Sequence, residues 1–124
     1  MKIRGKERGF ELNVQSHHEI EELCPGQDFS NFGQIFANKP QGEVLQLDMK
    51  IACILNKGFE DHKAFDDPTH TPEYLTMEDM RFLKVTDVLK LEAELLKAIS
   101  EDEHTEIQTE EPKPEPGTGK KSPE

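Results

Sequence analysis

The chain has 124 residues, of which only 33% are hydrophobic, and a net charge of −11 that divides almost evenly between residues 1–100 and 101–124. An acidic surface repels the phosphates of nucleic acids and of anionic membranes, so we expect neither as a partner, whereas it favours solubility and basic protein partners. Cys24 and Cys53 are too few for a disulfide framework, no apolar segment follows the N-terminus and no apolar run is longer than Ile51–Leu55, so we expect a cytoplasmic protein.

The first predicted element is a β-hairpin. Lys2–Arg4 and Phe10–Val14 alternate apolar and polar residues, and a glycine lies at each end of the charged connection between them. Phe10, Leu12 and Val14 would face the core in this hairpin. Because an isolated two-stranded hairpin is marginally stable in water, we expect it to pack on the helices that follow.

A first helix is predicted from Ser16 to about Cys24. Ser16, with Glu19 three residues later, matches a capping box, and Pro25-Gly26 would end the helix. Ile20, Leu23 and Cys24 have the spacing of a buried stripe.

A second, shorter helix is expected to begin at Asp28 or Ser30 and to break around residues 38–42. It would bury a cluster of four apolar side chains. These are Phe29, Phe32, Ile35 and Phe36.

Glu43–Lys57 is the strongest single element, and its pattern fits two structures. Alternating apolar residues at its start are typical of a strand, but the run is long and has no turn signal, which favours a helix. Asn56-Lys57-Gly58 matches a helix C-terminus. We expect this helix to be the central one, with a buried face formed by Val44, Leu47, Ile51, Ile54 and Leu55.

Two short elements are predicted next. Phe59–Phe65 would form another helical turn, ended by Asp66-Asp67-Pro68. Thr76, followed by acids in the first turn, would cap a short helix that ends near Lys84.

Thr86–Ser100 is predicted as the final long helix, with Asp87, Lys90, Glu94 and Lys97 on one polar stripe. Its apolar face is broad for a terminal helix. It therefore either closes the core or is partly offered to a protein partner, which makes it the candidate binding face. Its residues are Val88, Leu89, Leu91, Leu95, Leu96 and Ile99.

The chain is expected to divide into a helical domain, residues 1–100, and a disordered acidic tail rich in proline and glycine, residues 101–124. Ile107 is the only aliphatic residue of the tail. Such a segment cannot bury enough apolar area to offset the entropy lost on ordering.

The sequence predicts no catalytic, cofactor or metal site. His17 and His18 are adjacent on a helix and point about 100° apart, so they cannot chelate one ion together. Cys24, Cys53, His62 and His70 have no metal-binding spacing, and the acids near residues 60–67 lack the order of a calcium loop. We therefore expect a protein that is not an enzyme.

Several elements together resemble the tail assembly chaperones of long-tailed (siphovirus-like) bacteriophages and prophages. They are the hairpin Lys2–Val14, the buried helix Val44–Leu55 with the residues after it, and Tyr74–Asp79 leading to Thr86–Ser100. The resemblance covers roughly residues 1–100 and consists of capping signals and hydrophobic spacings.

This resemblance implies a small, helical, non-enzymatic protein of the host cytoplasm. Such chaperones bind the tape-measure protein, keep it soluble and help to recruit tail-tube subunits during tail morphogenesis, and they are expected to be absent from the mature virion. The family commonly adds a longer form by translational frameshifting. Gly119-Lys120-Lys121 would be the place for it, and this chain would then be the short form.

Two other functions stay open: a structural phage or prophage adaptor at the head–tail junction or in the tail, and an acidic inhibitor that mimics DNA. An adaptor would remain in the finished particle. A DNA mimic needs carboxylates spaced like phosphates, and the mixed signs of Lys90, Glu94 and Lys97 count against it.

Overall fold

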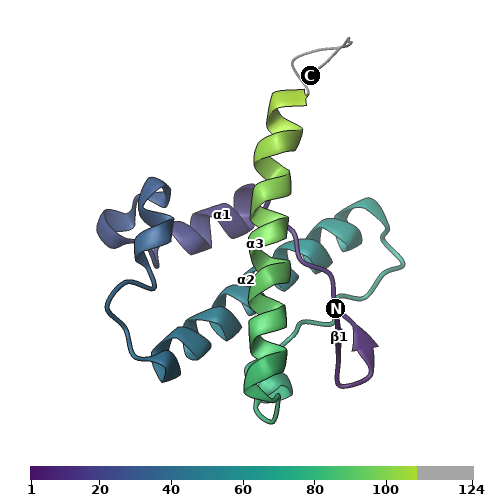
Figure 1. Ribbon diagram of the computed structural model, residues 1–124. Helices are drawn as coiled ribbons and strands as arrows, with labels where there is room; N and C mark the ends of the chain where they lie inside the picture. Colours follow the sequence, from purple (N-terminus) through teal and green to yellow (C-terminus); the bar gives the residue numbers. More distant parts are fainter. Residues whose placement is uncertain (109–124) are drawn as a thin grey trace.

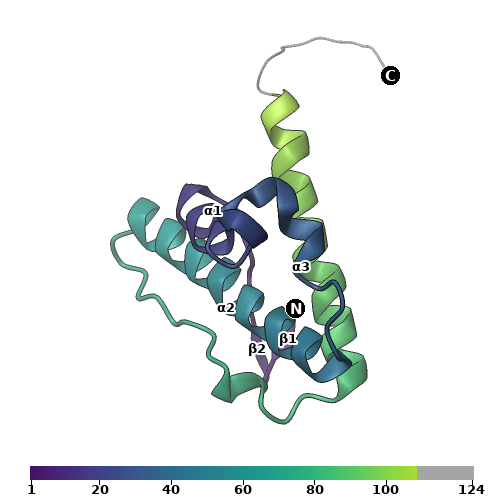
Figure 2. The same ribbon diagram turned by 90° about the vertical axis from the view of Figure 1, so that its left-hand side faces the viewer.

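Helices form most of the structure, a computed structural model that describes residues 1–108, with the backbone alone from 101 to 108. Figures 1 and 2 show α3 lying across α1 and α2, with the short hairpin on the side of its first turns. This confirms the expected mainly helical fold with an N-terminal hairpin. The elements are β1 (Lys2–Ile3), β2 (Lys6–Glu7), α1 (Val14–Glu21), η1 (Pro25–Gln27), η2 (Phe29–Gln34), α2 (Gln41–Asp66), η3 (Glu78–Met80) and α3 (Val85–Gln108).

The hairpin is shorter than predicted. β1 pairs with β2 in antiparallel register, Ile3 opposite Lys6, and the chain turns at Arg4 and Gly5. Both turn residues have positive φ, 54° and 77°, as a two-residue hairpin turn requires. The prediction of Phe10–Val14 as the second strand is wrong. The tight turn at Arg4 and Gly5 places the second strand directly after it, at Lys6–Glu7.

Residues 9–13 pack against α2 instead of pairing as a strand. The N–H of Glu11 donates to the carbonyl of Leu55 at 3.1 Å, and Asn56 Nδ2 donates to the carbonyl of Gly9 at 3.0 Å. Leu12 is buried as predicted, but Val14, also predicted to face the core, is 88% exposed. Alternation along the segment fails at Val14, because that residue already belongs to a helix.

α1 begins earlier than the sequence predicted. Its N-cap is Asn13, whose Oδ1 accepts the N–H of Ser16 at 3.1 Å, while Ser16 Oγ accepts the N–H of Asn13 at 2.9 Å. This capping box replaces the predicted pairing of Ser16 with Glu19. Ser16 is the third residue of the helix and not its cap, and it is fully buried and also donates to the carbonyl of Glu11.

α2 is longer than predicted, because Gly58 is not a helix terminus. A Cβ at Gly58 would lie 3.1 Å from the Cβ of Ser16, where α1 begins against α2. The glycine thus lets α1 approach α2 closely, and α2 continues through it without a break. Residues 59–65, predicted as a separate turn, extend α2, which ends at Asp66 where the sequence placed a break.

The short elements follow the predicted capping signals. Asp28 caps η2 by accepting the N–H of Ser30 at 3.0 Å. Thr76 and Asp79 bond each other's backbone N–H groups, at 3.0 and 3.2 Å. The predicted helix after Thr76 is nevertheless reduced to the three residues of η3, which anchors the loop through the buried Met80.

α3 begins one residue before the predicted Thr86 and runs past Ser100 to Gln108. Acidic residues such as Glu101 and Glu103 have good helix propensity, and the next proline is Pro112, so nothing in the sequence breaks the helix at 100. The expected tail therefore starts within a helix. Residues 109–124, the rest of that tail, lie outside the described residues.

The core lies where α3 crosses α2 and the hairpin and loops close around them. Burying each large apolar side chain contributes about 1.5–3 kcal/mol. The buried hydrophobic residues are Ile3, Leu12, Ile20, Cys24, Ile35, Ile51, Ala52, Leu55, Leu75, Met80, Val88, Leu91, Leu95 and Ile99.

Candidate protein-binding surfaces

The structure divides the predicted binding face of α3 into two parts. Four of its six residues, Val88, Leu91, Leu95 and Ile99, are buried in the core at 7% exposure or less. The other two are half-exposed, Leu89 at 48% and Leu96 at 44%. Most of the broad face therefore closes the core, and its flank alone is open to solvent.

The exposed flank is longer than these two leucines. Val85 is 48% exposed, and at 100° per residue it lies within about 40° of Leu89 and Leu96 around the helix. Phe82, just before the helix, is 85% exposed, and the guanidinium of Arg81 lies 5.0 Å above its ring. We call Phe82, Val85, Leu89 and Leu96 the α3 ridge.

A second exposed apolar area lies between the start of α1 and the C-terminal half of α2. It is an open hollow of about 700 Å³, lined by Val14, Ala64 and Phe65 among others. Phe65 is 86% exposed, although it lies in a helix that is otherwise central to the core. We call this area the α1–α2 hollow.

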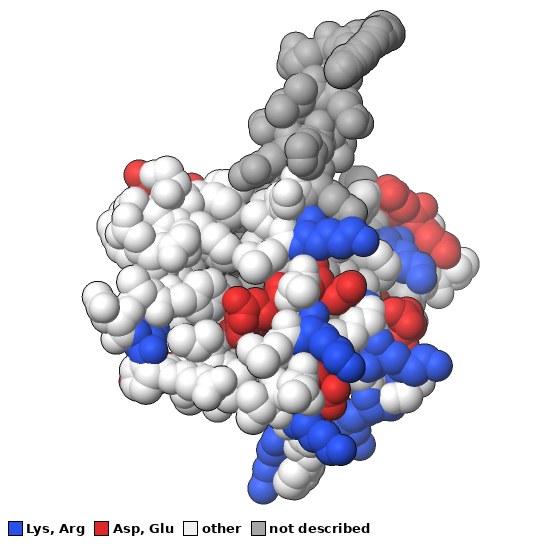
Figure 3. All heavy atoms as spheres, viewed as in Figure 1, with Lys and Arg blue, Asp and Glu red and all other residues white. Residues whose placement is uncertain are grey.

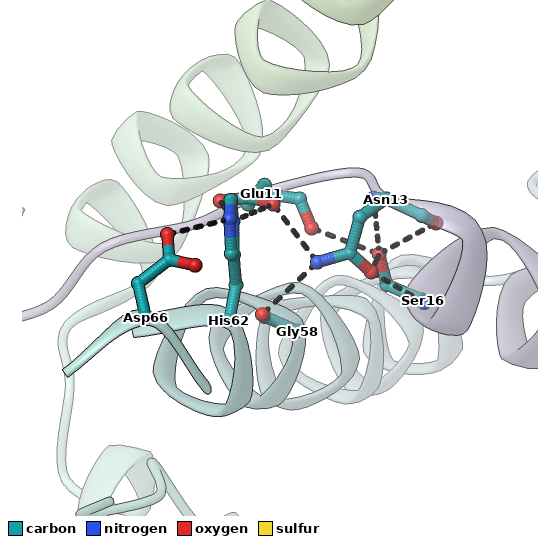
Figure 4. Close-up of polar contacts among 6 residues, drawn as sticks. All are labelled: Glu11, Asn13, Ser16, Gly58, His62 and Asp66. Carbon is teal, nitrogen blue, oxygen red and sulfur yellow. Dashed lines mark hydrogen bonds and ion pairs between the residues drawn. The ribbon is translucent and has the colours of Figure 1, made fainter. Parts of the chain in front are cut away.

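The polar side of the hollow holds an ordered row of charged groups (Figure 4). His62 lies between two carboxylates: its Nδ1 is 2.8 Å from Glu11 Oε2, and its Nε2 is 3.2 Å from Asp66 Oδ2. The hydrogen bond to Glu11, and then the charges of Glu11 and Asp66, raise the pKa of His62. When it is protonated, His62 donates on both sides and has no lone pair for a metal or for base catalysis.

Asp61 adds a further carboxylate to the same rim. It accepts hydrogen bonds from Gln15 Nε2 at 2.8 Å and from the hydroxyl of Tyr74. Although partial burial acts to raise the pKa of Asp61, the bonds from Tyr74 and Gln15 lower it. Asp61 is therefore charged at neutral pH, and the rim is acidic.

The histidines and cysteines considered from the sequence lie apart. The ring of His17 stacks on Phe29 at 4.2 Å, and His70 pairs with Glu60 at 2.8 Å. Burial raises the pKa of both Cys24 and Cys53, which disfavours a reactive thiolate. Among the described residues, no three His, Cys, Asp or Glu side chains are grouped so that they could hold a metal ion.

One buried acid was missed from the sequence. Asp48 on α2 is 1% exposed, and neither of its carboxylate oxygens meets a hydrogen-bond donor within residues 1–100. Burial, and then the neighbouring carboxylate of Glu92 on α3, raise the pKa of Asp48 to about 7. The sequence around Asp48 gives no signal that this acid is buried, because it is α3, distant in the sequence, that covers it where the two helices cross.

Charge on the molecular surface is mixed in sign. Figure 3 shows Lys and Arg interspersed with Asp and Glu along the face of α3 turned to the viewer. Within residues 1–100, no continuous acidic row runs along that face. Within residues 1–108, no helix combines the length and the apolar character needed to cross a membrane.

Comparison of the chain with protein-family models, with curated proteins and with solved structures finds no match in any of the three.

Proposed function

We propose that this protein is a non-enzymatic assembly chaperone of the phage-tail type, which binds the tape-measure protein in the host cytoplasm and helps to recruit tail-tube subunits. The observation that carries the proposal is the α3 ridge, a line of apolar side chains exposed beside the core. The resemblance of residues 1–100 to tail assembly chaperones is the reason for proposing the tape-measure protein as the client.

The ridge suits a long, hydrophobic, helical client. Val85, Leu89 and Leu96 recur on one side of α3, so an amphipathic client helix laid along α3 would meet all three. Each is only half-exposed, so covering it adds about 1 kcal/mol at most. A chaperone must release its client, and such modest contacts permit release.

The remaining surface supports solubility of such a complex. The net charge of −11 opposes association between complexes. The same charge is the basis of the DNA-mimic alternative, but Lys90 and Lys97 are exposed on α3 and would repel a site built to bind phosphates.

The test is co-expression with the tape-measure protein, read as the fraction of that client in the soluble lysate and in a pull-down. We expect the wild-type chain to solubilise the client and the double variant Leu89→Gln, Leu96→Gln to lose about fivefold or more of the complex. The matched control is Lys90→Gln, Lys97→Gln, on the polar stripe of the same helix, which should retain it.

Two results would refute the proposal: a client that stays insoluble with the wild-type chain, or equal losses for the ridge and the control variants. Mass spectrometry of purified particles separates the chaperone from a structural adaptor. A chaperone is absent from finished tails, and a stoichiometric presence there would favour the adaptor.

A further inference from the structure

The α1–α2 hollow combines exposed apolar side chains with an acidic rim. Val14, at 88% exposure, and Phe65, at 86%, come from different helices and line the same hollow. A phenylalanine this exposed forgoes most of the stabilisation that burial would give it. Two such side chains meeting at one hollow are typical of a surface used for binding.

The rim gives this hollow a definite charge. Glu11 and Asp61 line it, Asp66 pairs with the lining residue His62, and α2 ends beside it with the negative end of its dipole. The nearby cation Lys57 lies 4.0 Å from Glu19 on α1. Residues 60–67 hold four carboxylates against Lys63 and His62, so this segment stays negative whether or not His62 is protonated.

From this combination we propose that the hollow binds a segment of a partner protein in which an apolar side chain is flanked by arginine or lysine. The apolar side chain would cover Val14 and Phe65, and the cations would pair with the rim carboxylates. This site lies on elements other than the α3 ridge, so the proposal does not depend on the tape-measure client.

The molecule itself contains the expected contact geometry. Arg81 lies 5.0 Å above the ring of Phe82, another nearly fully exposed phenylalanine. An arginine from a partner can adopt the same position over Phe65, with the carboxylates of Glu11 and Asp61 lining the same hollow. A cation over an exposed ring contributes about 0.5–1 kcal/mol, and the carboxylates add to this.

The test uses a fluorescein-labelled peptide with a Leu-Arg-Leu-Arg centre between Gly-Ser ends, titrated with the full-length protein and followed by fluorescence anisotropy. We expect saturable binding that weakens as salt rises. A peptide with Glu in place of Arg, or Ser in place of Leu, should bind about tenfold more weakly or not at all.

Two protein variants locate the site. Phe65→Gln should weaken binding about tenfold, and Asp66→Lys should weaken it by a similar factor. Phe82→Gln, an equally exposed phenylalanine on the ridge, is the matched control and should bind like the wild type. Both phenylalanines are outside the core, so circular dichroism and thermal melts should show unchanged folding.

Three outcomes overturn the proposal: no binding at millimolar protein, equal binding of the Glu peptide, or equal losses in Phe65→Gln and Phe82→Gln. Sedimentation of the protein alone tests a different occupant. Self-association that Phe65→Gln abolishes would show that a second copy of the chain fills the hollow, against the proposal. Loss of tape-measure binding on the ridge, with peptide binding intact, would refute only the chaperone assignment.

Discussion

Each half of α2 holds one fully buried polar side chain, and within residues 1–100 only one of the two has hydrogen-bond partners. In the C-terminal half, Asn56 is fully buried with partners on both sides: its Oδ1 accepts the N–H of Leu75 at 2.7 Å, and its Nδ2 donates to the carbonyl of Gly9 at 3.0 Å. In the N-terminal half, Asp48 is buried against α3 beside another carboxylate. Burial of these two side chains therefore has opposite effects on the stability of the fold, because burying a polar group is costly unless the group has hydrogen-bond partners.

The largest effect of a substitution on stability is expected at Asn56, whose polar atoms have hydrogen-bond partners. Asn56→Ala removes both hydrogen bonds and leaves the N–H of Leu75 and the carbonyl of Gly9 without partners, so we expect a loss of about 3 kcal/mol in the free energy of unfolding. Urea denaturation measures it. A loss below about 1 kcal/mol would mean that water replaces the side chain and that the two loops are not held by Asn56.

The opposite change is expected at Asp48. Its folded pKa, about 7, lies above the usual 3.8, so the folded state binds the proton more tightly and stability falls as pH rises between these values. Asp48→Asn should therefore stabilise the protein, by roughly 1–3 kcal/mol at pH 8 and by less at pH 5. Thermal melts at both pH values test this, with Glu94→Gln, an exposed change on α3, as the control.

A gain that is the same at pH 5 and pH 8 would contradict ionisation as its cause. Destabilisation at both would show that the carboxyl makes a favourable contact at the crossing, and the contrast with Asn56 would then disappear.

The smallest effect is expected at the exposed row beside the hollow. The folded pKa of His62 is raised, so its ion pairs add stability below the unfolded pKa of about 6.5, and this contribution is lost as pH rises through the folded value. His62→Gln should therefore be less stable than the wild type at pH 5.5 and equal to it at pH 9. Equal stability at both values would mean that solvent screens the pairs with Glu11 and Asp66 completely.

Much of the local structure could be predicted from the sequence. The helix start near Asp28, the break after Asp66 and the helical period of residues 86–100 all depend on neighbouring residues, and the structure contains each of them. The hairpin was predicted, but its second strand was displaced, because tight-turn geometry and not alternation selects the register.

The candidate binding surfaces were less predictable. The spacing of α3 placed Leu91 in an apolar stripe that the structure buries, and placed Leu89 among the residues that widen it, but it did not decide whether the whole broad face is covered. No sequence signal indicated that Phe65 and Val14 are exposed, and Val14 was expected to face the core. Their exposure depends on how α1 packs against α2. A close approach at Gly58 decides that meeting, and the sequence motif there suggested a helix end.

The sequence by itself determined the helical class, the acidic character and the approximate positions of the helices, since these follow from composition, periodicity and capping between near neighbours in the chain. Only the tertiary structure decided which residues of each apolar face are covered, that Asn56 ties two loops to α2, and that Asp48 is buried beside Glu92. The physical reason is that burial and hydrogen-bond partners at these sites come from residues distant in the sequence, and a helical pattern carries no information about what crosses it.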